Sequence, residues 1–332
     1  MHMIGSTVGA MRVWVLMADG VWDSSLAAVC DVLAAANALR GEVPQAPTEW
    51  SVTVVGTRRQ MHTAAGLRVT TVPIASADAA DVVVVPALGL RSPAQLIEDT
   101  RSKVLRPSVA AIAAAGGLGA EVVGACSGTL LMAQAGILDG QPATTSWWLG
   151  PLFREYFPTV ELDVAETLVF GRGVRTAGAA FAHIDLALSL VHQRSPVLAD
   201  LVARYLLIGD RASQAGFAMP AVMARHNPEL SAFERWVRAH LDQPIRIGVA
   251  AASIGVSERT LQRITDSSLG MSPLEFVNDV RLDEAVHLLR STGLSVEAVA
   301  ARVGFANATA LRRLVQRRLG KSPLAVRQGA FR

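Results

Sequence analysis

The stretch Ala251-Ala252-Ser253-Ile254-Gly255 recurs 49 positions later as Ala300-Ala301-Arg302-Val303-Gly304. A second block, Leu269-Gly270-Met271-Ser272-Pro273-Leu274, recurs at an offset of 50 as Leu319-Gly320-Lys321-Ser322-Pro323-Leu324. The offset grows by one because the turn after the glycine holds one more residue in the second copy. Two units of the same kind therefore follow each other near the end of the chain.

Each copy has the layout of a helix-turn-helix. A short apolar helix, residues 247–254 in the first copy, ends at a glycine suited to the left-handed cap conformation. Ser257 or Asn307 is then a good N-cap for a second helix with apolar residues at helical spacing, such as Leu261 and Ile264. The second helix of such a motif enters the major groove of DNA.

The outward side of each second helix is the predicted DNA-binding surface. Arg and Gln suit the edges of bases, and any arginine also neutralises phosphate, whereas a solvated arginine-rich helix is the structural alternative. The residues expected to face DNA are Ser257, Glu258, Arg259, Gln262 and Arg263 in the first copy, and Asn307, Thr309, Arg312, Arg313, Gln316 and Arg317 in the second.

The distribution of charge agrees with a polyanionic partner. From Ser231 to the end there are fifteen Lys or Arg residues against nine Asp or Glu residues, whereas the remainder of the chain holds 16 and 19. The positive surplus is therefore concentrated around the repeat, and the predicted partner is double-stranded DNA.

Residues 232–327 resemble the AraC-type DNA-binding domain. The resemblance is carried by Arg281-Leu282, Ala285 and Leu288-Leu289 in an expected bridging helix, by Val303-Gly304-Phe305, and by a Gly-x-Ser-Pro-x-x-x-Arg pattern that ends at Arg327. Members of that family usually have aromatic residues where this chain has Thr265, Leu311, Val315 and Val326. The resemblance implies two recognition helices in successive major grooves, about 34 Å apart.

The front of the chain alternates short β-branched runs with apolar helical stretches. Strands are expected at residues 12–17, 50–55, 81–86 and 118–123, and helices at 26–39, 104–115 and 129–135. Strands without polar alternation, placed between helices, predict an open, mainly parallel sheet of the α/β class. The fold class is thus α/β at the front with an all-α domain of two helix-turn-helix units at the end.

Gly124-Ala125-Cys126-Ser127-Gly128 lies between a predicted strand and a predicted helix. Small residues on both sides of a central cysteine permit a sharp elbow, and the following helix N-terminus is expected to favour the thiolate. The elbow and its surroundings resemble the PfpI-like branch of the class I glutamine amidotransferase superfamily. More closely, they resemble the GlxA-like regulators, which join such a domain to an AraC-type tail. The resemblance implies an amidotransferase-like sandwich with flavodoxin-like layers.

In an open α/β domain the default site lies at the carboxyl ends of the strands. The expected effector pocket comprises Asp23, Ser25, Leu88, Gly89, Cys126, Ser127, Ser146 and Trp147. In catalytic PfpI-like proteins a His follows the cysteine, and GlxA-like regulators often have another in a Thr-x-His-Trp pattern. This chain has Ser127 and Ser146 at those two positions. Cys126 is therefore expected to be non-catalytic and to line the pocket; a space-filling role and a cysteine-dependent hydrolase or amidase are the alternatives.

The expected domains are a sensor at residues 11–205, a connector at 206–231 and the DNA-binding domain at 232–330. Two cysteines, Cys30 and Cys126, are too few for a disulfide framework, and no metal or other cofactor is expected. No apolar run reaches the ~18–20 residues that span a bilayer, and no signal peptide is recognised, so a cytoplasmic protein is expected. We expect a homodimeric transcription regulator controlled by a small molecule.

Overall fold

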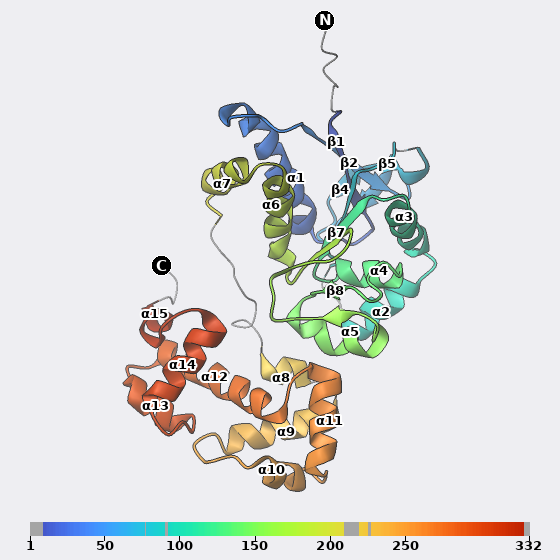
Figure 1. The fold of residues 1–332 in the computed structure, drawn as a ribbon. Coiled ribbons are helices and arrows are strands. Elements are labelled where there is room, and N and C mark those ends of the chain that lie inside the picture. The colour runs from blue at the N-terminus through green and yellow to red at the C-terminus, as the bar shows by residue number, and fades with distance from the viewer. Residues whose placement is uncertain (1–8, 77, 90–91, 209–218, 225–226, 329–332) are drawn as a thin grey trace, which may run out of the picture. The chain divides into compact units, whose positions relative to one another are not determined.

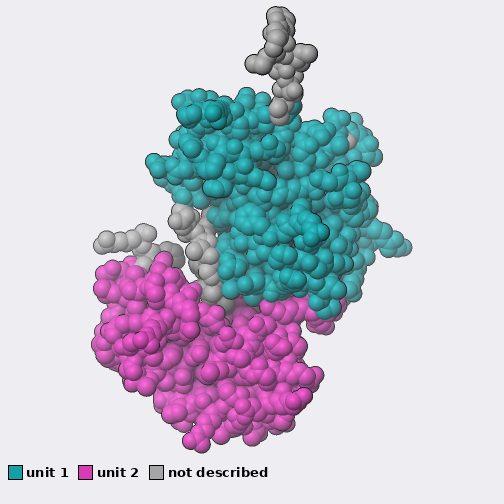
Figure 2. All heavy atoms as spheres, viewed as in Figure 1, with its two compact units in different colours: residues 1–146, 157–212 teal, residues 147–156, 213–332 magenta. Residues whose placement is uncertain are grey.

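The computed structural model describes residues 9–76, 78–89, 92–208, 219–224 and 227–328. The chain divides into two compact units, which Figure 2 shows in different colours. Residues 1–146 and 157–212 form unit 1, and residues 147–156 and 213–332 form unit 2. In the described part of the chain, unit 1 contains all the strands and unit 2 contains only helices.

Seven strands form the central sheet of unit 1, in the order β10-β11-β7-β6-β1-β2-β5 (Figure 1). Every neighbouring pair is parallel except β10 with β11. The bounds are β1 (Met11–Met17), β2 (Trp50–Gly56), β5 (Val72–Pro73), β6 (Val82–Val85), β7 (Glu121–Ala125), β10 (Leu168–Phe170) and β11 (Val174–Ala177). β6 is buried along its whole length, which explains its unbroken run of valines.

Helices cover both faces of this sheet (Figure 1). One face carries α1 (Asp23–Leu39), α6 (His183–Arg194) and α7 (Pro196–Tyr205), and the other carries α2 (Pro93–Arg101), α3 (Arg106–Gly117) and α4 (Gly128–Gln134). The first group shares one apolar core with sheet residues such as Val13, Val84 and Ala177. These three layers confirm the predicted open, mainly parallel α/β domain.

The strand expected at residues 118–123 begins three residues later, as β7 at Glu121. Helix α3 continues through Gly117, and the chain then turns at Gly119, whose φ is +91°. Leu118 lies in this turn and is 85% exposed. The apolar character of Leu118 therefore reflects a helix end rather than a buried strand.

Unit 2 is built around one long helix, α12 (Pro273–Ser291). Its side chains Phe276, Val277 and Val280 enter one apolar core, and Leu282, Ala285 and Leu289 enter a second. The other helices are α5 (Gly150–Tyr156), α8 (Pro220–Met223), α9 (Pro228–Ala239), α10 (Ile247–Ser253), α11 (Glu258–Leu269), α13 (Val296–Arg302), α14 (Ala308–Leu319) and α15 (Pro323–Gln328). This arrangement confirms the predicted all-α domain with a bridging helix.

Helix α9 begins earlier than the start at residue 232 suggested for the DNA-binding domain. Asn227 accepts a hydrogen bond from the Leu230 N–H at 3.0 Å, and Pro228 occupies the first helical turn. Leu230 and Met223 are buried in the first core of unit 2. Part of the segment expected to be a connector therefore belongs to the packed core of this unit.

Candidate DNA-binding surface and effector site

The first repeat copy folds as a helix-turn-helix. Helix α10 ends in a turn at Gly255, whose φ of +80° lies in the left-handed region that glycine adopts without strain. Ser257 then accepts a hydrogen bond from the Thr260 N–H at 3.1 Å and caps α11. Ala251, four residues before the glycine, is fully buried where the two helices pack together.

The second copy repeats this geometry. Gly304 has a φ of +75°, and Asn307 accepts a hydrogen bond from the Ala310 N–H at 3.0 Å to cap α14. Ala300 is buried in the same way as its counterpart. Both predicted caps and both predicted turn glycines are present.

The second helix of each motif has one buried face and one exposed face. Leu261, Leu311 and Val315 have no exposed surface. Thr265 is also fully buried, and its hydroxyl donates to the Leu261 carbonyl at 3.1 Å, which compensates for a polar group inside the core. The side chains predicted to face DNA are all exposed: Ser257, Glu258, Arg259, Gln262, Arg263, Asn307, Thr309, Arg312, Arg313, Gln316 and Arg317.

The two exposed faces differ in charge. On α14, Arg312 pairs with Glu297 of α13 at 2.8 Å, whereas Arg313 and Arg317 have no ion-pair partner among the described residues. On α11, Glu258 stands near the start, with its carboxylate so close to Gly248 of α10 that a Cβ there would lie 2.8 Å from it. Arg259 and Arg263 of α11 likewise have no ion-pair partner among the described residues, but α14 carries no acidic side chain. A polyanion therefore meets a more positive net charge on α14 than on α11.

Helix α14 is also attached to α12 by an ion pair that no sequence motif indicated. Arg318 lies 2.9 Å from Asp279, and both side chains are mostly buried. Burial raises the pKa of Asp279 to about 6, although Arg318 opposes this effect. The link between recognition helix and bridging helix thus contains a carboxyl group that titrates below neutral pH.

In unit 1, Cys126 forms the predicted elbow between β7 and α4. Its φ of +54° is a left-handed value that is unusual for a residue with a side chain. Ser146 donates a hydrogen bond to Cys126 Sγ at 2.9 Å, and Ser127 donates one to the Leu88 carbonyl at 2.9 Å. The next residue but one, Gly128, has to be a glycine, because a Cβ at that position would lie 2.4 Å from the Val85 carbonyl oxygen.

The expectation that Cys126 is a favoured thiolate is wrong. The side chain is buried, and burial raises the pKa of the Cys126 thiol above its ordinary value, despite the opposing hydrogen bonds from Ser146 and Ser127. Desolvation disfavours the charged form more strongly than these contacts favour it. Cys126 is therefore a neutral thiol at neutral pH.

Hydrogen bonds bring together most of the residues predicted for the effector pocket. The Trp22 N–H, next to Asp23, donates to the Ala87 carbonyl at 2.8 Å, and the Gly89 N–H donates to the Gly20 carbonyl at 2.6 Å. Ser25, Leu88, Cys126, Ser127 and Ser146 are buried around this junction of loops at the carboxyl ends of β1, β6 and β7. Trp147 differs, since it belongs to unit 2.

Asp23 is the acidic group of this cluster. Its Oδ2 accepts a hydrogen bond from the Ala65 N–H at 3.1 Å, while its Oδ1 is buried without a partner among the described residues. A hydrogen bond from Thr63, followed by the one from Ala65, lowers the pKa of Asp23. Asp23 is therefore ionised, and its Oδ1 is a buried acceptor.

His183, at the start of α6, is a buried group that the sequence patterns did not select for the site. Its Nδ1 lies 2.8 Å from the Ala180 carbonyl, and its Nε2 has no hydrogen-bond partner among the described residues. Burial lowers the pKa of His183 to about 4, so the ring is neutral at pH 7. No motif around His183 in the sequence signals this burial.

Comparisons with known proteins agree with both halves of this description. Residues 250–329 match the family described as Helix-turn-helix domain. The chain is 31% identical over 210 residues to the HTH-type transcriptional regulator CdhR of Pseudomonas aeruginosa. This match covers 62% of this chain and 62% of CdhR. It is 26% identical over 323 residues to the regulator GbdR of the same species, covering 95% of this chain and 83% of GbdR. A further match is the regulator GlxA of Rhizobium meliloti, at 26% over 216 residues, covering 64% of this chain and 66% of GlxA.

The chain is similar to these regulators in sequence and contains the helix-turn-helix match at residues 250–329, and it spans less than two thirds of the length of CdhR. A solved structure described as a THiJ/PfpI family protein from Pseudomonas syringae shares the fold, with a TM-score of 0.50 and 18% identity. The match covers 61% of this chain and 77% of the solved one. It supports the predicted amidotransferase-like fold.

Two further observations concern the described part of the chain. No helix there has both the length and the apolar character needed to cross a membrane. No group of three or more His, Cys, Asp or Glu side chains there is arranged to hold a metal ion.

Proposed function

We propose that this GlxA-like protein is a sequence-specific regulator of transcription that binds double-stranded DNA through α11 and α14. The observation that carries the proposal is the exposure of every predicted DNA-facing side chain on two capped second helices. Each helix buries its opposite face, so the polar side chains are presented from a fixed surface. Two such surfaces in one unit favour a defined DNA site over general affinity for nucleic acid.

Selection of duplexes from a random library with the full chain at moderate salt tests this proposal. We expect enrichment of sites that contain two contacted segments about 10 base pairs apart. Arg312→Ala is expected to alter the preference at particular base pairs if Arg312 reads bases. Arg317→Ala, as the matched control on the same helix, is expected to weaken all sequences alike. Failure of the wild-type protein to enrich any sequence contradicts specific regulation.

We also propose that unit 1 is not a catalyst. A cysteine nucleophile needs a base or another means of forming the thiolate, whereas Cys126 is a buried thiol hydrogen-bonded to Ser146. The runner-up remains a cysteine-dependent hydrolase or amidase, which the elbow geometry at Cys126 favours. Loss of amide or acyl hydrolysis in Cys126→Ser, relative to a measurable wild-type rate, would restore that alternative.

The loop junction around Cys126 is the proposed effector site, and Asp23 suggests its polarity. The unpartnered Oδ1 of Asp23 favours a ligand with a cationic or hydroxyl group. Asp23→Asn is therefore expected to change the response of DNA binding to the effector, with unchanged DNA affinity in its absence. We further propose a cytoplasmic homodimer formed through the α/β domain, which light scattering of the full chain will check.

A further inference from the structure

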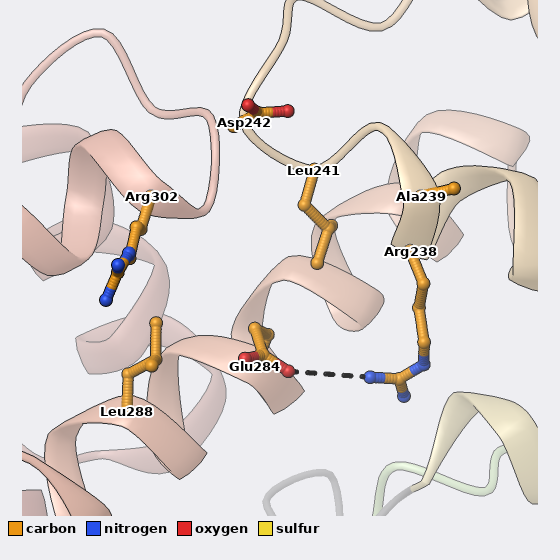
Figure 3. A pocket seen from close by; sticks show the side chains of 7 residues that line it. All are labelled: Arg238, Ala239, Leu241, Asp242, Glu284, Leu288 and Arg302. Carbon is orange, nitrogen blue, oxygen red and sulfur yellow. Dashed lines mark ion pairs between the residues drawn. The ribbon is translucent and has the colours of Figure 1, made fainter.

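The two helix-turn-helix motifs of unit 2 meet at a boundary beside α12, which we call the seam. Each motif has its own apolar core, and both cores use α12 as a wall. Beside α12 the seam is hollow, with a cavity of about 530 Å³ (Figure 3). Side chains from α9 and the loop after it, from α12 and from α13 line this space: Arg238, Ala239, Leu241, Asp242, Glu284, Leu288 and Arg302. Continuous apolar packing therefore does not fix the two motifs on this side.

The turn of the second motif approaches the first motif at Gly304. A Cβ on Gly304 would lie 2.0 Å from the Leu241 carbonyl oxygen and 2.7 Å from Arg281 Nη2. The equivalent Gly255 has a similar φ, but a Cβ there would meet nothing within 4 Å. The repeated glycines thus have the same backbone role and different neighbours.

Arg281 joins the two sides of the seam from its place on α12. Its Nη2 donates a hydrogen bond to the Gln243 carbonyl at 2.9 Å, in the loop that follows α9 of the first motif. The guanidinium carbon lies 5.5 Å from the ring centroid of Phe305, in the turn of the second motif. The residue is only 9% exposed, so both contacts form out of bulk water, where a charged hydrogen bond and a cation–π contact are stronger.

We propose that Arg281 is a positioning residue that sets the separation of the two recognition helices, and thereby the spacing of the two DNA segments they read. The proposal rests on the proposed function. A planar guanidinium can donate in its own plane while its face lies against an aromatic ring, which a lysine ammonium cannot reproduce. Without Arg281, Gln243 and Phe305 no longer share a partner. The two motifs are then held by the packing of each core on α12, by the Arg318–Asp279 pair and by the close approach of Gly304 to Leu241.

The test uses the full chain and duplexes enriched from a random library by the wild-type protein. One to three base pairs are inserted or deleted between the two contacted segments, and affinity is measured for each spacing. We expect the affinity of the wild type to fall about tenfold or more when one base pair is added, a cost typical of one mismatched site position. The affinity of Arg281→Met, which keeps bulk without charge or donors, is expected to fall less than about threefold, because its two motifs adapt to the new spacing.

Base preference within each segment separates positioning from general damage. Arg281→Met is expected to retain the wild-type preferences in both segments, since α11 and α14 keep their own cores. Arg290→Met, on the exposed side of the same helix, is the matched control and is expected to keep the wild-type spacing profile. Gly304→Ala is expected to shift the preferred spacing, whereas Gly255→Ala controls for the strain of a positive φ alone.

A folded Arg281→Met protein with the wild-type spacing profile would overturn the proposal and leave the proposed function intact. If Arg281→Met does not fold, Arg281→Lys and Gly304→Ala take its place in the test. A wild-type spacing profile in both of these variants would equally overturn the proposal. If the wild type enriches no sequence at all, the proposed function itself fails. The three results are therefore distinguishable.

Discussion

Cys126 illustrates how the surroundings of one side chain decide its chemistry. The elbow places the cysteine at a strand-to-helix turn, the position of a nucleophile in related folds. Here Ser146 contacts the sulfur, and the surrounding loops bury it. The same backbone shape that displays a nucleophile in an enzyme therefore holds a neutral thiol in this protein.

We expect Cys126 to react slowly with iodoacetamide in the native protein at pH 7, because the thiolate is the reactive form and burial disfavours it. Cys30, which is less buried, provides the internal comparison. Mass spectrometry of the alkylated peptides, before and after denaturation, measures both sites in one sample. Fast native labelling of Cys126 would contradict the neutral, buried thiol.

At the scale of elements, the two recognition helices share a fold and differ in charge. Arg313 and Arg317 lie on α14, which carries no acidic residue, whereas α11 mixes Arg259 and Arg263 with Glu258. Free arginines neutralise phosphates and release counterions, and mixed polar groups favour recognition of particular bases. The second motif is therefore expected to supply most of the contacts with phosphate, and the first to supply most of the discrimination between bases.

This difference predicts unequal salt dependence for two paired variants. Replacing Arg313 and Arg317 together by Gln is expected to reduce the log–log salt slope of DNA binding by about 2, because each arginine neutralises about one phosphate. Replacing Arg259 and Arg263 by Gln is expected to reduce the slope less and to relax base preference more. Fluorescence anisotropy across a salt series measures both quantities. Equal slopes for the two variants would refute the division of roles.

At the scale of the molecule, one buried group in each unit is expected to change stability in the opposite direction on acidification. His183 of unit 1 has a folded pKa of about 4, below its ordinary 6.5, so its contribution to stability is present above pH 6.5 and lost as pH falls towards 4. Asp279 of unit 2 has a folded pKa of about 6, above its ordinary 3.8, so the native state takes up the proton first and gains stability as pH falls.

Between pH 7 and pH 5 these groups change the free energy of unfolding by about 2 kcal/mol for His183 and about 1 kcal/mol for Asp279, with opposite signs. Thermal unfolding of wild type, His183→Asn and Asp279→Asn at both pH values checks the prediction. Relative to wild type, His183→Asn should lose less stability on acidification and Asp279→Asn should lose more. Parallel behaviour of all three proteins would contradict both assignments.

Local patterns in the sequence predicted the helices and strands well, but they predicted the contacts between these elements poorly. Ser257, Asn307 and the two turn glycines act within a few residues of their own positions, so their roles follow from spacing. The elbow at Cys126 was predictable for the same reason. Arg281 was visible only as a member of a motif, because Gln243 and Phe305 come beside it through packing over long separations in sequence. The neutral state of Cys126 likewise depends on burial, which spacing does not encode.

The unequal surroundings of Gly255 and Gly304 have a consequence for how such a duplicated protein evolves. The first turn borders open space, so changes beyond its glycine leave the neighbouring motif undisturbed. The second turn is confined by Leu241 and Arg281, so an inserted or enlarged residue there disturbs both motifs at once. We therefore expect substitutions and insertions to accumulate in the first copy during evolution. Changes in that copy are then the expected route by which a related protein comes to bind new target genes.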